Sequence, residues 1–158
     1  MNNEFINPFI ESAINVIKTM AQIDATCGQP AIKTGHMAGG DVTGIISMIG
    51  EQAHVSLAIT FSEPAILAIT SSMLGENIEI LDDTVADAVG EITNMVTGGS
   101  KRLLSEKGYK FDLASPSVIV GENHMIIHQL KAPVVILPFT TGAGDFFIEL
   151  CSLSLDAD

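Results

Sequence analysis

The sequence predicts an α+β fold, a two-layer sandwich in which long helices pack on one face of a mostly antiparallel β-sheet. Some segments carry apolar residues at helical spacing, whereas others are short runs of β-branched and apolar residues. Short turns join the strand-like runs, which favours antiparallel pairing. With 158 residues, 47% of them hydrophobic, the chain can bury a substantial core. We therefore expect a single domain over residues 1–158.

A first helix is expected over residues 8–22. Asn7 is a favourable N-cap, and Pro8 suits the first helical position because an amide hydrogen there would have no helical partner. Three strand-like runs follow, separated by glycine-containing turns, and we place them at 31–37, 42–49 and 53–61.

Two further helices are expected in the middle of the chain. Ser62 can cap the second helix, and Gly75 can end it as a left-handed residue. The third helix begins at Asp82 or Asp83, whose carboxylates complement the helix dipole, and closes at Gly108.

The last third of the chain is again strand-like, with runs at 117–120, 125–129, 134–139 and 146–153. The expected order is therefore one helix, three strands, two helices, and three or four strands. The two groups of strands resemble each other in layout, although their residues do not align one by one.

The third helix has two distinct faces. Its apolar stripe consists of Val85, Val89, Ile92, Val96 and Leu103. Its opposite row consists of Asp87, Glu91, Asn94, Gly98 and Lys101. Glu91 and Asn94 are three residues apart, so their side chains leave the same side of the helix. A rigid helix that presents a carboxylate beside an amide could insert both groups into the site of another protein.

A Glu-x-x-Asn pattern alone is weak evidence, because an ordinary solvated helix face would also explain Glu91 and Asn94. The same pattern occurs at Glu4 and Asn7. We discount that copy because the residue before a proline is disfavoured in helices and because no buried stripe is evident behind the pair.

Three glycines lie within the third helix, each at a cost of about 1 kcal/mol relative to alanine. Gly99 falls on the apolar stripe, where close packing explains it. Gly90 and Gly98 lie on or beside the exposed row, where a missing side chain would let a partner's backbone approach. Together with Asp87 and Lys101 they are predicted partner-binding residues, the alternative for the glycines being a local kink.

Composition excludes several classes of function. The net charge of −12 argues against nucleic acid or an anionic membrane as a partner. No apolar run reaches the roughly 18 to 20 residues that cross a bilayer, and no signal peptide is evident. Cys27 and Cys151 lie far apart with no paired spacing, which favours reduced thiols in the cytoplasm over a single disulfide. On a strand, His124 and His128 would be about 13 Å apart, too far to share a metal ion.

Residues 87–98, Asp-Ala-Val-Gly-Glu-Ile-Thr-Asn-Met-Val-Thr-Gly, resemble the signature helix of the CheX-type chemotaxis phosphatases, which are relatives of CheC and FliY. Segments 7–9, 73–76, 116–121 and 144–150 also fit the layout of that family. The resemblance covers nearly the whole chain.

This resemblance implies removal of the phosphoryl group from the aspartate of CheY-type receiver domains. Asn94 would orient the attacking water, and Glu91 would pair with the lysine of the receiver. The chain would have no cofactor of its own, since Mg²⁺ belongs to the receiver, and it would form a homodimer. Two alternatives are a docking module that does not hydrolyse the receiver and, less favoured, a metal hydrolase built on acidic residues.

Overall fold

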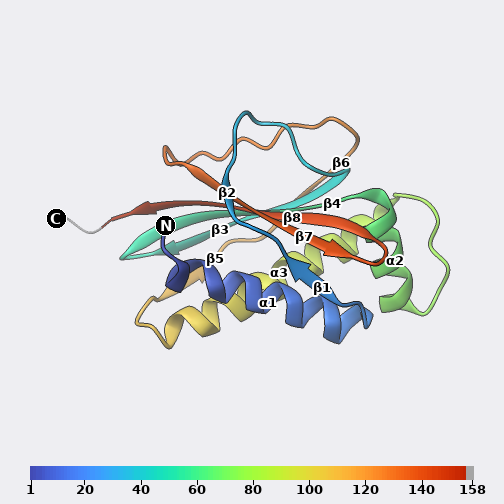
Figure 1. Cartoon of the computed structure of the whole chain (residues 1–158), viewed down its shortest axis with the longest axis horizontal. Helices are drawn as coiled ribbons and strands as arrows, with labels where there is room; N and C mark the ends of the chain where they lie inside the picture. Colours follow the sequence, from blue (N-terminus) through green and yellow to red (C-terminus); the bar gives the residue numbers. More distant parts are fainter. Residues whose placement is uncertain (156–158) are drawn as a thin grey trace.

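The computed structural model describes residues 1–155 and shows three helices packed against one eight-stranded antiparallel sheet (Figure 1). The helices are α1 (Asn3–Ala21), α2 (Glu63–Leu74) and α3 (Asp83–Ser105). The strands are β1 (Ala25–Cys27), β2 (Ala31–Ile32), β3 (Val42–Gly50), β4 (Ala53–Phe61), β5 (Phe111–Leu113), β6 (Ser117–Val120), β7 (Val134–Thr141) and β8 (Gly144–Ser154). The predicted α+β sandwich is confirmed.

The strand order is symmetric about the centre of the sheet. It runs β1-β7-β8-β4-β3-β5, with β2 also paired to β7 and β6 also paired to β3. Each strand of the first half of the chain therefore has a counterpart in the second half, at the same distance from the β4–β8 centre. This duplication explains why the two strand groups have similar layouts in the sequence.

The predicted start of the first helix is wrong. The helix begins at Asn3, capped by the side chain of Asn2, and Pro8 lies inside it. A proline at this depth removes only the hydrogen bond to the Glu4 carbonyl, near the exposed end of the helix. Burial of Phe5, Ile6 and Phe9 stabilises the early turns, so Glu4 and Asn7 do belong to a regular helix with a buried stripe behind them.

Both ends of α2 and the start of α3 agree with the sequence, whereas α3 ends at Ser105, three residues before the predicted Gly108. Ser62 caps α2 by accepting a hydrogen bond from Ala65 N, and Gly75 ends the helix with φ of 66°. Asp82 caps α3 by accepting hydrogen bonds from the amides of Thr84 and Val85. These local signals depend on side-chain chemistry within four residues, which is why the sequence reveals them.

Two predicted strands are largely absent. Of residues 31–37 only Ala31–Ile32 are strand, and residues 125–129 are irregular apart from a single bridge between Met125 and Met37. The segments between β2 and β3 and between β6 and β7 instead lie over the sheet face away from α1 and α3 (Figure 1). The short strands β1 and β5 were not predicted.

The main core lies between the helices and the sheet. Stacked rings of Phe139 and Phe146, with centroids 4.6 Å apart, fill one end of it. Near the middle, α3 lies so close to β3 that a Cβ atom at Gly44 would overlap the hydroxyl of Thr93. A glycine is therefore required at this contact, and the helix rests directly on the strand backbone.

Substitution Gly44→Ala should destabilise the fold by about 1–3 kcal/mol, because the added methyl group forces α3 away from β3. Urea denaturation measures the loss. The matched control is Gly142→Ala, at a turn position with no atom within 4 Å of the new methyl group, which should change stability by at most a few tenths of a kcal/mol. Equal losses in the two variants would contradict the close contact.

Candidate functional site

The outward face of α3 carries the candidate site. The side chains of Asp87, Glu91, Asn94 and Lys101 are all exposed, and they follow one another along the helix at steps of three to seven residues. Glu91 and Asn94 stand side by side on neighbouring turns. Within residues 1–155, neither side chain makes a hydrogen bond or salt bridge inside the protein, so both are free to meet another molecule.

The inward face of the same helix is firmly packed. Val85, Val89, Ile92 and Val96 are essentially inaccessible to solvent, as the sequence predicts. Leu104 is fully buried, whereas the predicted Leu103 is half-exposed. Leu104 belongs to a second buried row of the helix, which consists of Thr93, Thr97, Ser100 and Leu104 at steps of four, three and four residues.

Hydroxyl groups secure the middle of α3. Thr93 donates a 2.7 Å hydrogen bond to the Val89 carbonyl, and Ser100 donates a 2.8 Å hydrogen bond to the Val96 carbonyl. From α1, Ser12 donates a 2.7 Å hydrogen bond to the same Val96 carbonyl. A Cβ atom at Gly99 would overlap Ser12, so the glycine allows the two helices to cross closely. Glu91 and Asn94 are thereby presented from a rigid support.

The two other glycines of the helix lie in different surroundings. Gly98 is on the outward row, and a Cβ atom there would meet no atom within 4 Å. Gly90 is turned toward β6, where its Cβ position lies 3.6 Å from Val118 Cγ2. A role in partner binding thus remains a prediction for both, with open space in front of Gly98 only.

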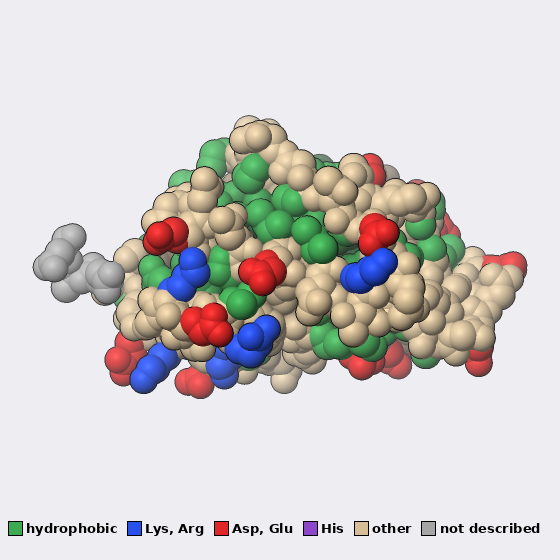
Figure 2. All heavy atoms as spheres, turned by 60° about the horizontal axis from the view of Figure 1, so that its bottom comes forward, with side chains coloured by type: hydrophobic (Ala, Val, Ile, Leu, Met, Phe, Trp, Pro, Cys, Tyr) green, Lys and Arg blue, Asp and Glu red, His purple; other side chains and the backbone are tan. Residues whose placement is uncertain are grey.

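A groove of about 600 Å³ between α1 and α3 adjoins the site. Half-buried Ile14, Met95 and Leu103 contribute apolar surface to it, and Gly98 opens it toward the outward row. Figure 2 shows this helix-bearing face of the molecule, where apolar groups are visible between acidic and basic side chains. The groove begins beside Asn94, at Met95 and Gly98, and could receive an apolar group of a bound protein.

The chemistry of the pair suits work on a phosphoryl group. An amide such as that of Asn94 can both accept and donate hydrogen bonds, and it stays neutral beside anionic oxygens. The Glu91 carboxylate, one turn away, can pair with a cation of a partner. The Asn94 amide is not a nucleophile, so in a hydrolysis that it assists a water molecule would attack.

Comparison with known proteins assigns the family. The family described as "Chemotaxis phosphatase CheX" matches residues 42–140, more than half of the chain. This chain belongs to the CheX family. A CheC-like superfamily protein from Shewanella sp. PV-4 is 50% identical, with 97% of this chain and 99% of that chain covered and a TM-score of 0.91.

The names of two more distant CheX proteins refer to CheY. The Thermotoga maritima protein named "CheY-P phosphatase CheX" is 26% identical over 124 residues, which are 78% of this chain and 79% of that protein. The solved CheX-CheY-BeF3-Mg²⁺ complex from Borrelia burgdorferi shares the fold, with a TM-score of 0.79, 24% identity, and coverage of 94% and 97% of the two chains.

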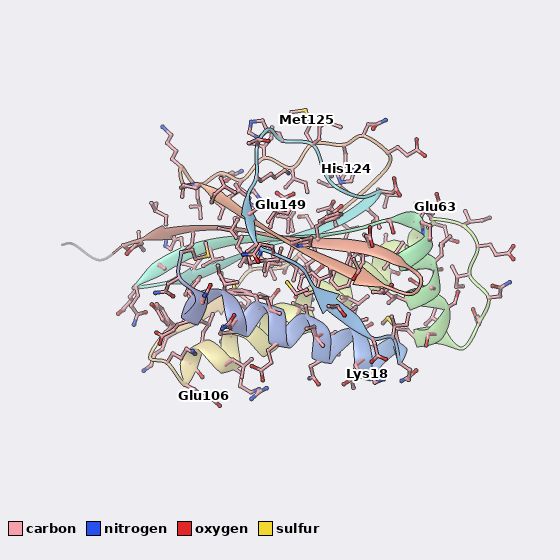
Figure 3. The ribbon with its side chains drawn as sticks, viewed as in Figure 1. Lys18, Glu63, Glu106, His124, Met125 and Glu149 are labelled. Carbon is pink, nitrogen blue, oxygen red and sulfur yellow. The ribbon has the colours of Figure 1, made fainter. Side chains whose placement is uncertain are left out.

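Three other ionisable side chains of this CheX-family chain, those of Glu149, His124 and His128, make hydrogen bonds or ion pairs within the protein. Glu149 is fully buried at the centre of the sheet, 2.6 Å from Lys33 Nζ and 3.1 Å from His128 Nε2. His128 also bonds Ser56, and His124 bonds Thr43, so both histidines join the overlying irregular segments to the sheet. Figure 3 shows His124 above the sheet and Glu149 at its level.

Within residues 1–155, little supports a metal site, a nucleophilic thiol or a membrane-spanning helix. That part of the chain has no group of three or more histidine, cysteine or acidic side chains placed to hold a metal ion. Burial raises the pKa of the Cys27 and Cys151 thiols, which disfavours the nucleophilic thiolate. None of the helices described could span a membrane.

Substitution Glu149→Gln should destabilise this protein by about 3–5 kcal/mol, because Lys33 is left buried without a countercharge. The exposed pair of Lys18 and Asp24 gives a matched control, since Asp24→Asn should cost at most about 1 kcal/mol. Chemical denaturation compares the two variants. Similar small losses in both would show that the cluster on Glu149 does not hold the irregular segments to the sheet.

Proposed function

We propose that this CheX-family phosphatase hydrolyses the aspartyl phosphate of a CheY-type receiver, with Asn94 orienting the attacking water and Glu91 anchoring the lysine of the receiver. The observation that carries the proposal is the exposed, internally unpaired Glu91–Asn94 pair on a helix fixed by packing behind it. The Thermotoga relative named as a CheY-P phosphatase supports the substrate class.

Hydrolysis of this kind needs positioning more than covalent chemistry from the protein. Water attacks the phosphorus in line with the aspartyl oxygen, the phosphorus–oxygen bond to the aspartate breaks, and phosphate and a free carboxylate result. Asn94 would hold that water at the required distance and angle. A carboxylate at the same position would repel the phosphoryl oxygens, whereas the neutral amide does not.

Charge stabilisation would come from the receiver. We propose that the Mg²⁺ ion arrives with the receiver and that the chain contributes no cofactor of its own. The presence of Mg²⁺ in the CheX-CheY complex from Borrelia is consistent with this division. Glu91, paired with the lysine of the receiver, would fix the docking geometry in which Asn94 reaches the phosphoryl group.

Asp87, Gly90, Gly98 and Lys101 are proposed to contact the receiver around this pair. Four of the seven lysine and arginine residues of the chain lie within residues 101–110. These basic groups are exposed, and Figure 2 shows basic side chains interspersed with acidic ones at its left, where α3 ends. On a chain of net charge −12, they offer a local cationic region to an acidic partner.

We further propose that the whole chain acts as one phosphatase domain, that it forms a homodimer, and that it works in the cytoplasm. Support for one domain comes from the sheet, because strands of the first half of the chain pair with strands of the second half in it. The second candidate function is a docking module without hydrolysis. An amide at position 94 disfavours that alternative, since docking alone has no need of a water-orienting group.

Substitution Asn94→Ala should lower the rate of receiver dephosphorylation by about 10²- to 10³-fold, as expected for loss of one preorganised hydrogen-bonding group. Phosphate release from a phosphorylated receiver in Mg²⁺ measures the rate, and receiver affinity should change much less. Gln129→Ala, which removes an exposed amide beyond the opposite sheet face, is the control. Full activity of the Asn94 variant would refute the assignment.

Substitution Glu91→Ala should weaken binding of the phosphorylated receiver, because the lysine loses its countercharge. Titration calorimetry with a receiver activated by beryllium fluoride measures the affinity. Glu122→Ala removes an exposed carboxylate elsewhere and matches the change in net charge. Equal affinities of the two variants would argue against an anchoring role for Glu91.

A further inference from the structure

The two helices that bound the groove beside the candidate site run antiparallel. Ser12 of α1 meets Gly99 of α3, whereas Phe5, seven residues earlier, packs against Tyr109, ten residues later. Figure 1 shows α1 and α3 side by side beneath the sheet. The α1 wall of the groove, within residues 11–18, therefore extends from the level of Gly99 toward the level of the candidate pair.

One row of α3 faces both the candidate pair and the groove. It consists of Glu91, Met95, Gly98 and Arg102, at steps of four, three and four residues, so these positions lie in line along the helix. The last three of them also line the groove. With a rise of about 1.5 Å per residue, Gly98 lies roughly 6 Å along the helix axis from Asn94. A group that enters the groove is thus held next to the Asn94 amide.

Gly98 makes a notch in this row. Glycine destabilises the interior of a helix, so its presence there calls for a reason. The adjacent Gly99 has one, because a Cβ atom at that position would overlap Ser12. At Gly98 a Cβ atom would meet no atom within 4 Å in the part of the chain that the structure describes. The space in front of Gly98 is open within the chain, and an incoming group of a partner accounts for the glycine.

Apolar side chains form the walls of the groove. Met95 from α3 and Ile14 from α1 are half-buried, and both pack against the hydrophobic core. Leu103, also half-buried, lies farther along α3. Because methionine is flexible and polarizable, Met95 can adapt to the shape of a bound apolar side chain. The groove volume of about 600 Å³ lies within the range of ligand-binding pockets, roughly 300 to 1,000 Å³.

A free cation stands at the rim of the groove. Arg102 is exposed, and within residues 1–155 its guanidinium makes no hydrogen bond or salt bridge. Lys18, on the opposite wall, is paired with Asp24 at 2.9 Å. The exposed Glu11 lies on the same α1 wall and so across the groove from Arg102. A carboxylate that approaches along α3 would therefore pair with Arg102.

We propose that this groove is a specificity pocket, which seats an apolar side chain of the CheY-type receiver while Arg102 pairs with an acidic side chain beside it. The inference rests on the proposed function of Glu91 and Asn94. A protein interface of ordinary size covers about 800 Å² of each partner, so a receiver seated on that pair extends over Gly98. Met95, Gly98 and Arg102 then decide which receivers bind, whereas Asn94 acts on the phosphoryl group that all of them carry.

Filling the notch tests the pocket. Gly98→Leu should raise the KM for the phosphorylated receiver by about tenfold, because the new side chain occupies the space of the receiver's apolar group. The rate at saturating receiver should fall much less, since Glu91 and Asn94 are unchanged. Leucine is a better helix former than glycine, so the melting temperature should not fall. Phosphate release in Mg²⁺ gives both kinetic constants, and circular dichroism gives the melting temperature.

Truncation of a groove wall provides a matched pair of variants. Met95→Ala should weaken binding of a receiver activated by beryllium fluoride and Mg²⁺ by about tenfold in titration calorimetry, since an apolar contact is lost. Met73→Ala removes the same side chain from α2, where it is likewise half-buried and packed against the core. Both substitutions should lower the stability of the chain, but Met73→Ala should leave receiver affinity unchanged.

Salt dependence tests the charge at the rim. Arg102→Ala should weaken receiver binding at low ionic strength and should make the affinity less sensitive to added salt, because one ion pair with the receiver is lost. Lys131→Ala removes an exposed cation from the segment between β6 and β7 and is the control. It should change neither the affinity nor its salt dependence.

Normal receiver affinity of both Gly98→Leu and Met95→Ala would refute the pocket, and the proposed function would stand as long as Asn94→Ala slows phosphate release. An unchanged KM with a lower maximal rate for Gly98→Leu would also refute it. If Gly98→Leu alters the molecular mass of the free chain in analytical ultracentrifugation but not its receiver affinity, a second copy of the chain occupies the groove and the proposal is overturned. Full activity of Asn94→Ala would refute the proposed function instead.

Discussion

The close contact of α3 with its two neighbours determines how this protein presents its surface. Beneath the helix, Gly44 brings the backbone of β3 against Thr93, and beside it Gly99 brings α1 against Val96. Because neither contact has room for an added methyl group, the rotation of α3 about its own axis is fixed. The outward row, with Glu91 and Asn94 at its centre, follows from that rotation.

A helix held in this way suits a protein that acts inside the site of another. Catalysis by positioning requires a group to be held within a fraction of an ångström, which an exposed loop rarely achieves. The buried valines and isoleucine of α3 supply that rigidity, while its exposed side remains polar and unpaired. On the opposite face of the sheet, buried Glu149 pairs with Lys33 and His128 and so holds the irregular segments that carry these two residues in place.

The sequence predicts well what depends on neighbouring residues. The caps at Ser62 and Asp82 and the two faces of α3 are examples, since periodicity and local hydrogen bonds determine them. The sequence predicts poorly what depends on distant contacts. Pro8 is tolerated within α1 because Phe5 and Phe9 are buried by the rest of the fold, and the segment 125–129 is held over the sheet by His124 and His128 rather than by strand pairing.

The most direct test of the central claim is phosphate release from a phosphorylated CheY-type receiver in Mg²⁺, measured with and without the unmodified chain. If the chain hydrolyses the aspartyl phosphate, substoichiometric amounts of it accelerate release over the receiver alone, and the chain itself is not consumed. Unchanged release from a receiver that binds the chain would contradict hydrolysis and favour the docking module.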